Sequence, residues 1–213
     1  MKKQIILLAG KINSGKNHAG SFLEQRYINQ GIPTAHLFFA KRLKDLCCHT
    51  FERYSTYLQN ELTKIVSRSD DPVIREIAEN LMIHQKNWYE EKNDSTRLIL
   101  QDVGTRLVRD AMDADFWPRQ IIPAITAGKE EVYIITDFRF PNEYQVLKTE
   151  LGKTCTIHTI RIEREIPEKE HISNHPSEDS LGTFPFDFTV NNRGSLADFE
   201  RALDELFYKL QRS

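Results

Sequence analysis

The stretch that decides the fold reads GKINSGKN and runs from Gly10 to Asn17. It follows the apolar run Gln4 to Ala9, which predicts a buried strand, and it leads into helical spacing from Lys16 to Asn29. A G-x-x-x-x-G-K loop between a strand and a helix is typical of phosphate binding, because its backbone N–H groups and the helix N-terminus face a polyphosphate. We therefore predict a P-loop that binds ATP through Gly10, Lys11, Asn13, Ser14, Gly15, Lys16 and Asn17.

Within this loop, Lys16 is the predicted catalytic residue, since its ammonium can bridge the outer two phosphates of ATP. Asn17 departs from the pattern and stands where a Ser or Thr hydroxyl normally meets magnesium. An amide oxygen can ligate a hard cation or hold one of its waters, so Asn17 is a candidate magnesium ligand. The alternative is a tight strand-to-helix turn with a surface lysine, but the flanking strand and helix favour the phosphate loop.

Strand and helix patterns alternate along the rest of the chain. Strands are predicted at 4–9, 34–39, 131–137, 154–163 and 186–191, and helices at 16–29, 40–57, 96–112, 116–127, from Pro141 onward, and at 195–210. This order predicts an α/β fold, a parallel-sheet P-loop kinase with three layers (α/β/α), in a single domain over residues 1–213. The polar, charge-rich stretch of about 55–94 is expected to be a helical substrate-binding insertion. Ligands of such sheets bind beyond the carboxyl ends of the strands.

Charge and composition narrow the partners. Lys and Arg number 29 against 31 Asp and Glu, a net charge of −2, so no overall field favours nucleic acid or an anionic membrane. The first apolar run is far shorter than the roughly 18 residues of a spanning helix. Three cysteines, two of them adjacent, fit a reducing cytoplasm better than a disulfide framework. We expect small-molecule substrates and no nucleic acid or membrane partner, and a homodimer stays open.

Short motifs follow the other predicted strands and helices. They are Phe39-Ala40-x-x-Leu43-Lys44, Leu100-Gln101-x-x-Gly104-Thr105-x-x-x-Arg109, Asp115-Phe116-Trp117, Thr136-Asp137-Phe138-Arg139-Phe140-Pro141-Asn142-Glu143 and His175-Pro176-Ser177-Glu178. Together with GKINSGKN, this set resembles the bacteriophage deoxynucleoside monophosphate kinases and their relatives, the animal-type phosphomevalonate kinases. The resemblance implies transfer of a phosphoryl group from ATP to a deoxynucleoside monophosphate with Mg²⁺, in the host cytoplasm if the chain is phage-encoded.

The residues predicted to bind the acceptor come from these motifs. They are Arg42, Lys44, Gln101, Gly104, Thr105, Arg106, Arg109, Trp117 and Glu178. Arg106 and Arg109 lie three apart, so a helix would place them on one face, where they can grip a phosphate or a base. The alternative for this pair is an ion-pair ladder with Asp102, Asp110 and Asp113.

Asp137 and Arg139 are the predicted catalytic pair after the third strand. They alternate by two, so both side chains can face the same side of the strand end. We expect Asp137 to hold the water shell of magnesium or to orient the acceptor, and Arg139 to hold the transferring phosphate bidentately. The alternative is a mutual salt bridge.

Two later segments complete the predicted site. The polar loop of about 164–180 is expected to be a lid, with Arg164 as the catalytic arginine that covers ATP. Asn192 and Gly194 follow the last strand, where the resemblance implies the adenine of ATP; a turn and N-cap for the helix after Ser195 is the plainer reading.

The mechanism predicted is direct in-line transfer, because an acceptor phosphate is already ionised near neutral pH and needs no strong base. Two rivals remain at this point: another small-molecule P-loop kinase, above all a phosphomevalonate kinase, and a non-catalytic nucleotide-binding protein with a decayed loop.

Overall fold

The structure is a computed structural model, and it describes residues 2–45, 47, 60–61, 63–64, 66–68, 70–73, 75, 100–164 and 180–212. The chain divides into two compact units. The first consists of residues 1–40 together with 114–213, and the second of residues 41–113. The predicted insertion of 55–94 falls in the second unit, and most of it lies outside the described residues.

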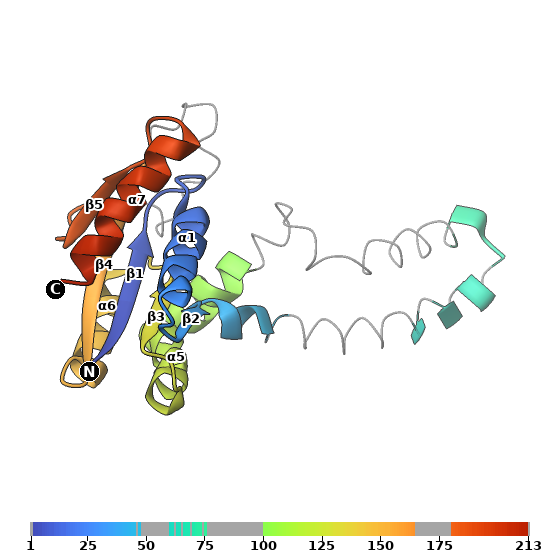
Figure 1. Cartoon of the computed structure of the whole chain (residues 1–213). Helices are drawn as coiled ribbons and strands as arrows, with labels where there is room; N and C mark the ends of the chain where they lie inside the picture. The colour runs from blue at the N-terminus through green and yellow to red at the C-terminus, as the bar shows by residue number, and fades with distance from the viewer. Residues whose placement is uncertain are drawn as a thin grey trace. The chain divides into compact units, whose positions relative to one another are not determined.

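A parallel sheet forms the centre of the first unit (Figure 1). Its strands are β1 (Lys3–Ala9), β2 (Thr34–Leu37), β3 (Val132–Ile135), β4 (Cys155–Glu163) and β5 (Phe188–Asn191), in the order β2-β3-β1-β4-β5. Every neighbouring pair is parallel; Leu7 of β1, for example, lies opposite Ile135 of β3 and Thr159 of β4. Because parallel neighbours end at the same edge, the loops after β1 and β3 leave the sheet side by side.

Helices cover both faces of the sheet. α1 (Lys16–Asn29) and α7 (Leu196–Leu210) pack on one face, and α5 (Phe116–Ala127) and α6 (Pro141–Leu151) pack on the other. Side chains alternate along β1, so that Ile6 and Leu8 join the first core while Ile5 and Leu7 join the second. A strand buried on both faces is apolar throughout, which is why Gln4 to Ala9 shows no alternation in the sequence. The predicted three-layer α/β/α fold is confirmed.

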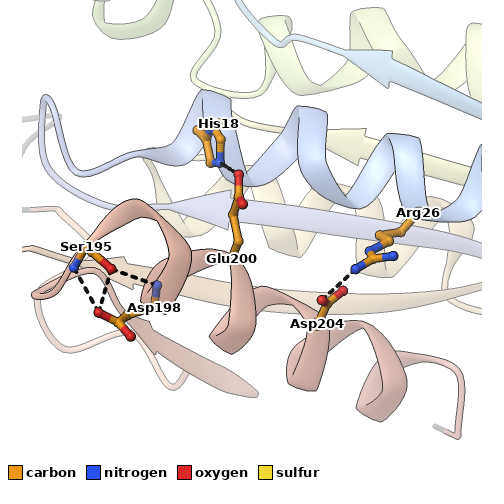
Figure 2. A network of polar contacts seen from close by, with 6 residues as sticks. All are labelled: His18, Arg26, Ser195, Asp198, Glu200 and Asp204. Carbon is orange, nitrogen blue, oxygen red and sulfur yellow. Dashed lines mark hydrogen bonds and ion pairs between the residues drawn. The ribbon is translucent and has the colours of Figure 1, made fainter.

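Side-chain contacts join α7 to α1 (Figure 2). His18 Nε2 lies 3.0 Å from Glu200 Oε1, and Arg26 Nη2 lies 2.6 Å from Asp204 Oδ2. These pairs are partly exposed, and such pairs contribute little on their own. The buried faces of the two helices carry the packing, with the rings of Tyr27 and Phe207 in edge-to-face contact at 4.9 Å.

The second unit contains a π-helix, η1 (Asp102–Asp110), within the predicted helix of 96–112. Residues 41–45 are helical, as predicted for the start of the helix of 40–57. A Cβ on Gly104 would lie 2.5 Å from Leu43 Cδ2, so Gly104 gives Leu43 room to pack within this unit. A π-helix closes i→i+5 hydrogen bonds and is wider than an α-helix, so residues three apart diverge more than the α-helical spacing predicts.

The predicted boundaries of the first unit are largely confirmed. The helices of 16–29 and 116–127 begin and end as predicted, while the strands of 131–137 and 186–191 shorten to Val132–Ile135 and Phe188–Asn191. Of the predicted lid of 164–180, only Arg164 and Ser180 belong to the described residues, and Glu178 does not. In the part of the chain that the structure describes, no helix combines the length and apolarity needed to cross a membrane.

Candidate active site

The glycine-rich loop lies at the carboxyl end of β1, the central strand. β1 leads through α1 to β2 on one side, whereas β3 leads through α6, on the other face, to β4 on the other side. Connections that run in opposite directions from adjacent strands mark the place where ligands bind in open α/β sheets. The sequence of the loop and the topology of the sheet therefore indicate the same position.

Both glycines of the loop are required by its geometry. Gly10 has φ +153° and Gly15 has φ +100°, values that L side chains rarely adopt. A Cβ at Gly10 would lie 2.4 Å from the carbonyl oxygen of Ile162, and one at Gly15 would lie 2.7 Å from Asn192 Nδ2. Asn13, at φ +59°, is a further left-handed residue, a conformation that Asn tolerates better than most side chains.

Lys16 lies over the start of the loop. Its Nζ donates to the carbonyl oxygens of Gly10, at 2.5 Å, and Lys11, at 2.6 Å. Ser14 Oγ is buried and has no hydrogen-bond partner among the residues that the structure describes. An ammonium group, a loop whose glycines leave no room for a Cβ, and a buried hydroxyl that lacks a partner together fit a polyphosphate ligand.

Two residues from distant segments of the chain donate hydrogen bonds to backbone carbonyl oxygens of the phosphate loop. Arg164 Nη1 donates to the carbonyl oxygen of Asn13 at 3.3 Å, and Asn192 Nδ2 donates to that of Ser14 at 2.9 Å. The structure thus brings Arg164 and Asn192 to the loop. Arg164 was predicted to cover ATP and Asn192 to lie near its adenine, and both roles stay predictions. Gly194 lies in the same turn after β5, against the side chain of Asp198.

Asp137 anchors the end of β2. Its Oδ1 accepts the N–H of Phe39 at 3.0 Å, and its Oδ2 accepts the N–H of Ala40 at 2.9 Å. Hydrogen bonds to a carboxylate are stronger than those to a neutral acceptor, so Asp137 stabilises the turn after β2. No sequence pattern predicted this contact, because it joins residues about a hundred positions apart.

The donor set is compatible with magnesium. Among the described residues there is no group of three or more His, Cys, Asp or Glu side chains that could hold a metal. Magnesium at a nucleotide needs only one or two protein oxygens, because phosphates and waters complete its octahedron. A carboxylate has about four lone-pair sites, so Asp137 can accept bonds beyond the two backbone ones. Asn17 is exposed in the first turn of α1.

The loop after β3 is held by Glu143 and Asn142, which belong to a quoted motif but were given no predicted role, and by Ser180. Glu143 is buried, and its Oε2 accepts the N–H groups of Arg139 at 2.7 Å and Phe140 at 3.0 Å. Asn142 Nδ2 donates to the carbonyl oxygen of Ala114 at 2.8 Å. The hydroxyl of Ser180 donates to the carbonyl oxygen of Arg139. A proline followed two positions later by Glu is an N-terminal helix signal that could have identified Glu143.

The remaining predicted acceptor residues lie in the second unit, apart from Trp117 and Glu178. Arg42 and Lys44 are exposed, while Gln101, Thr105 and Arg109 are half-buried. Arg106 forms a bidentate pair with Asp102, at 2.5 and 2.9 Å, and this hydrogen-bonded pairing lowers the pKa of the Asp102 carboxyl. The contact matches the ion-pair alternative for Arg106, and substrate binding by these residues stays a prediction.

Trp117, in the first unit, is mostly buried at the start of α5. Only 8% of its surface is exposed, and its ring makes an edge-to-face contact with Phe116, with the centroids 4.9 Å apart. Packing therefore accounts for most of this side chain, and its predicted contact with substrate remains untested.

No curated protein matches the sequence of this chain. Among solved structures, it is similar to a mutant of the APS kinase CysC from Mycobacterium tuberculosis, with a TM-score of 0.42 and 9% identity over 99% of this chain and 96% of that chain. The family model described as deoxynucleotide monophosphate kinase matches residues 39–203, well over half of the chain.

This matched range begins after the phosphate loop, so the loop is a separate indication, outside that range, of a phosphate-binding site. The narrower resemblance to the bacteriophage members stays a prediction. The chain belongs to the deoxynucleotide monophosphate kinase family and is an ATP-dependent nucleotide kinase.

Proposed function

We propose that this kinase transfers the γ-phosphoryl group of ATP to a deoxynucleoside monophosphate in a single in-line step, which gives a deoxynucleoside diphosphate and ADP. The observation that carries the proposal is the phosphate loop at the end of β1, beside the loop after β3 that contains Asp137 and Arg139. Two anionic substrates that meet at one sheet edge need cationic groups from both loops. Lys16, Arg164 and Arg139 are the groups we assign to this task.

We expect the ammonium group of Lys16 to stabilise the negative charge that develops on the phosphates during transfer. Its Nζ bonds two loop carbonyl oxygens, of Gly10 and Lys11. A phosphate oxygen is a charged acceptor and forms a stronger hydrogen bond with an ammonium than a carbonyl does. A polyphosphate in the loop therefore draws the ammonium away from these carbonyls and onto its outer phosphates, where charge develops during transfer.

Magnesium is the metal we expect with ATP. When bound, it would neutralise negative charge on the phosphates of ATP. We assign Asn17 and Asp137 as the residues that hold it, directly or through its waters, because each offers an oxygen at a loop that borders the predicted polyphosphate site. Asp137 then has two tasks, since it also anchors Phe39 and Ala40.

No side chain is needed as a strong base. The acceptor oxygen belongs to a phosphate that is largely ionised near neutral pH. The work of the protein is to position the two substrates and to stabilise charge. We expect sequential kinetics and inversion at phosphorus; a phosphorylated enzyme that is competent for turnover would contradict this.

The test is an ADP-release assay with ATP and a panel of acceptors: dTMP, dGMP, dCMP, dAMP, their ribose analogues and mevalonate phosphate. At least one deoxynucleotide should stimulate release. Lys16→Ala should lower kcat by roughly 100- to 1,000-fold, the effect of losing one transition-state donor, or more. The exposed Lys129→Ala is the matched control and should behave as wild type. Stimulation by mevalonate phosphate alone, or ATP binding without acceptor-dependent release, would refute the proposal.

A further inference from the structure

Asn192 lies on the phosphate loop rather than apart from it. Its side-chain amide donates to the carbonyl oxygen of Ser14 at 2.9 Å, across 178 positions of sequence. The same Nδ2 atom also packs against Gly15. A Cβ added to Gly15 would lie only 2.7 Å from it, so the Asn192 amide lies beside the Gly15 Cα. One side chain therefore contacts the loop at two consecutive residues.

The segment that carries Asn192 is held on both sides. On the β5 side, the backbone N–H of Asn192 donates to the carbonyl oxygen of Glu163 at 2.7 Å and continues the β4–β5 pairing. After it, Ser195 and Asp198 form a reciprocal cap at the start of α7, with Ser195 Oγ accepting from the N–H of Asp198 (Figure 2). A side chain held in this way loses little entropy when it bonds the loop, so the contact is preorganised.

The contact determines which way one peptide group faces. The chain has no cis peptide bonds among the described residues, and in a trans peptide the C=O and the following N–H point in opposite directions. With the carbonyl of Ser14 held toward Asn192, the N–H of Gly15 points away from Asn192. An anion-binding loop needs its N–H groups on the ligand side and its carbonyl oxygens turned away.

We propose that Asn192 is a positioning residue for the polyphosphate of the nucleotide: it holds the Ser14 carbonyl and thereby aims the Gly15 N–H at a phosphate. This differs from recognition of the adenine base, which the turn after β5 first suggested. The inference rests on the proposed function only in that ATP occupies the loop. Inorganic tripolyphosphate, which has the phosphates without a base, is the probe that separates the two roles.

The experiment compares wild type with Asn192→Ala and with the matched control Asn191→Ala, an exposed neighbour at the end of β5. Calorimetry measures binding of ATP, GTP and tripolyphosphate. In Asn192→Ala, affinity for ATP and tripolyphosphate should fall by the same factor, about tenfold, the effect of one misdirected hydrogen bond to a charged group. The ratio of ATP to GTP affinity should not change. In turnover, KM for ATP should rise about tenfold while kcat changes little, because the bond acts equally in ground and transition states.

A conservative variant keeps the test decisive. Asn192→Gln retains an amide donor and should recover part of the lost tripolyphosphate affinity, whereas Asn192→Asp cannot donate and should lose more than alanine. Loss of ATP affinity with unchanged tripolyphosphate binding, or an altered ATP to GTP ratio, would overturn the inference in favour of base contact. A lower melting temperature with unchanged affinities would overturn it in favour of a purely structural bond. Because binding is measured without an acceptor, these results stand even if no deoxynucleotide is phosphorylated.

Discussion

Replacing Asp137 by Asn tests whether this carboxylate stabilises the fold in addition to its proposed role in holding magnesium. Each of its oxygens accepts one backbone N–H, from Phe39 and from Ala40. Whichever way the Asn amide turns, one of these N–H groups faces an NH₂ group and loses its acceptor. An unsatisfied donor costs about 1–3 kcal/mol, and the remaining bond weakens by about 1 kcal/mol because its acceptor becomes neutral. The expected loss of unfolding free energy is therefore about 2–4 kcal/mol.

The assay is urea unfolding of Asp137→Asn and wild type without nucleotide or magnesium. A loss of this size lowers the unfolding midpoint without changing the slope, because the exposed surface stays the same. For a chain of this length, the melting temperature should fall by roughly 2–4 °C for each kcal/mol. A second readout, the magnesium dependence of turnover, should show a raised requirement for the ion if Asp137 also holds it, as we propose.

The matched control is Glu131→Gln, an equally conservative change at an exposed position just before β3. It should leave both readouts unchanged. If Asp137→Asn unfolds at the same urea concentration as wild type, the anchoring role is wrong. If its stability falls but its magnesium dependence is that of wild type, the anchor stands and the metal assignment fails.

Two further predictions concern buried polar groups in the first unit. Glu143→Ala removes the acceptor of the Arg139 and Phe140 N–H groups and should cost about 3 kcal/mol of stability in denaturant unfolding. Glu143→Gln keeps an acceptor and should cost about 1 kcal/mol, so equal losses in the two variants would contradict the geometry. Burial lowers the pKa of His158, and the charge of Asp187 opposes this effect by a smaller amount. As pH falls below about 6.5, His158 is therefore protonated in the unfolded chain before it is protonated in the folded one. The contribution of this histidine to stability is complete at neutral pH and declines toward acid pH. His158→Gln should therefore show a shallower loss of unfolding free energy between pH 7.5 and pH 5; parallel pH profiles would refute this.

The sequence alone was sufficient for the architecture of the first unit. The runs that form β1 and β3 are apolar and short, and the segments between them include stretches with helical spacing. This pattern predicts parallel strands connected by helices. The phosphate loop was also readable, because the two glycines and Lys16 lie in one contiguous stretch and their geometry is local. Such features depend on the preferences of neighbouring residues, which the sequence displays directly.

Periodicity was insufficient for the second unit. The pattern of 96–112 predicted an α-helix, and the structure has a π-helix, Asp102–Asp110, within this range. The hydrophobic pattern does not distinguish i→i+4 from i→i+5 hydrogen bonding, because both place apolar residues on one face. The sequence left two roles for Arg106, a substrate contact or an ion pair, and the structure shows it paired with Asp102.

The partners of the site residues were decided only by tertiary structure. Asp137 bonds Phe39 and Ala40, and Asn192 bonds Ser14, because the order β2-β3-β1-β4-β5 brings these strand ends together. A sequence identifies a polar side chain at a strand end but not which of several nearby donors or acceptors it meets. That choice follows from the order in which the strands lie across the sheet, and strand order is a property of the packed chain rather than of any local stretch.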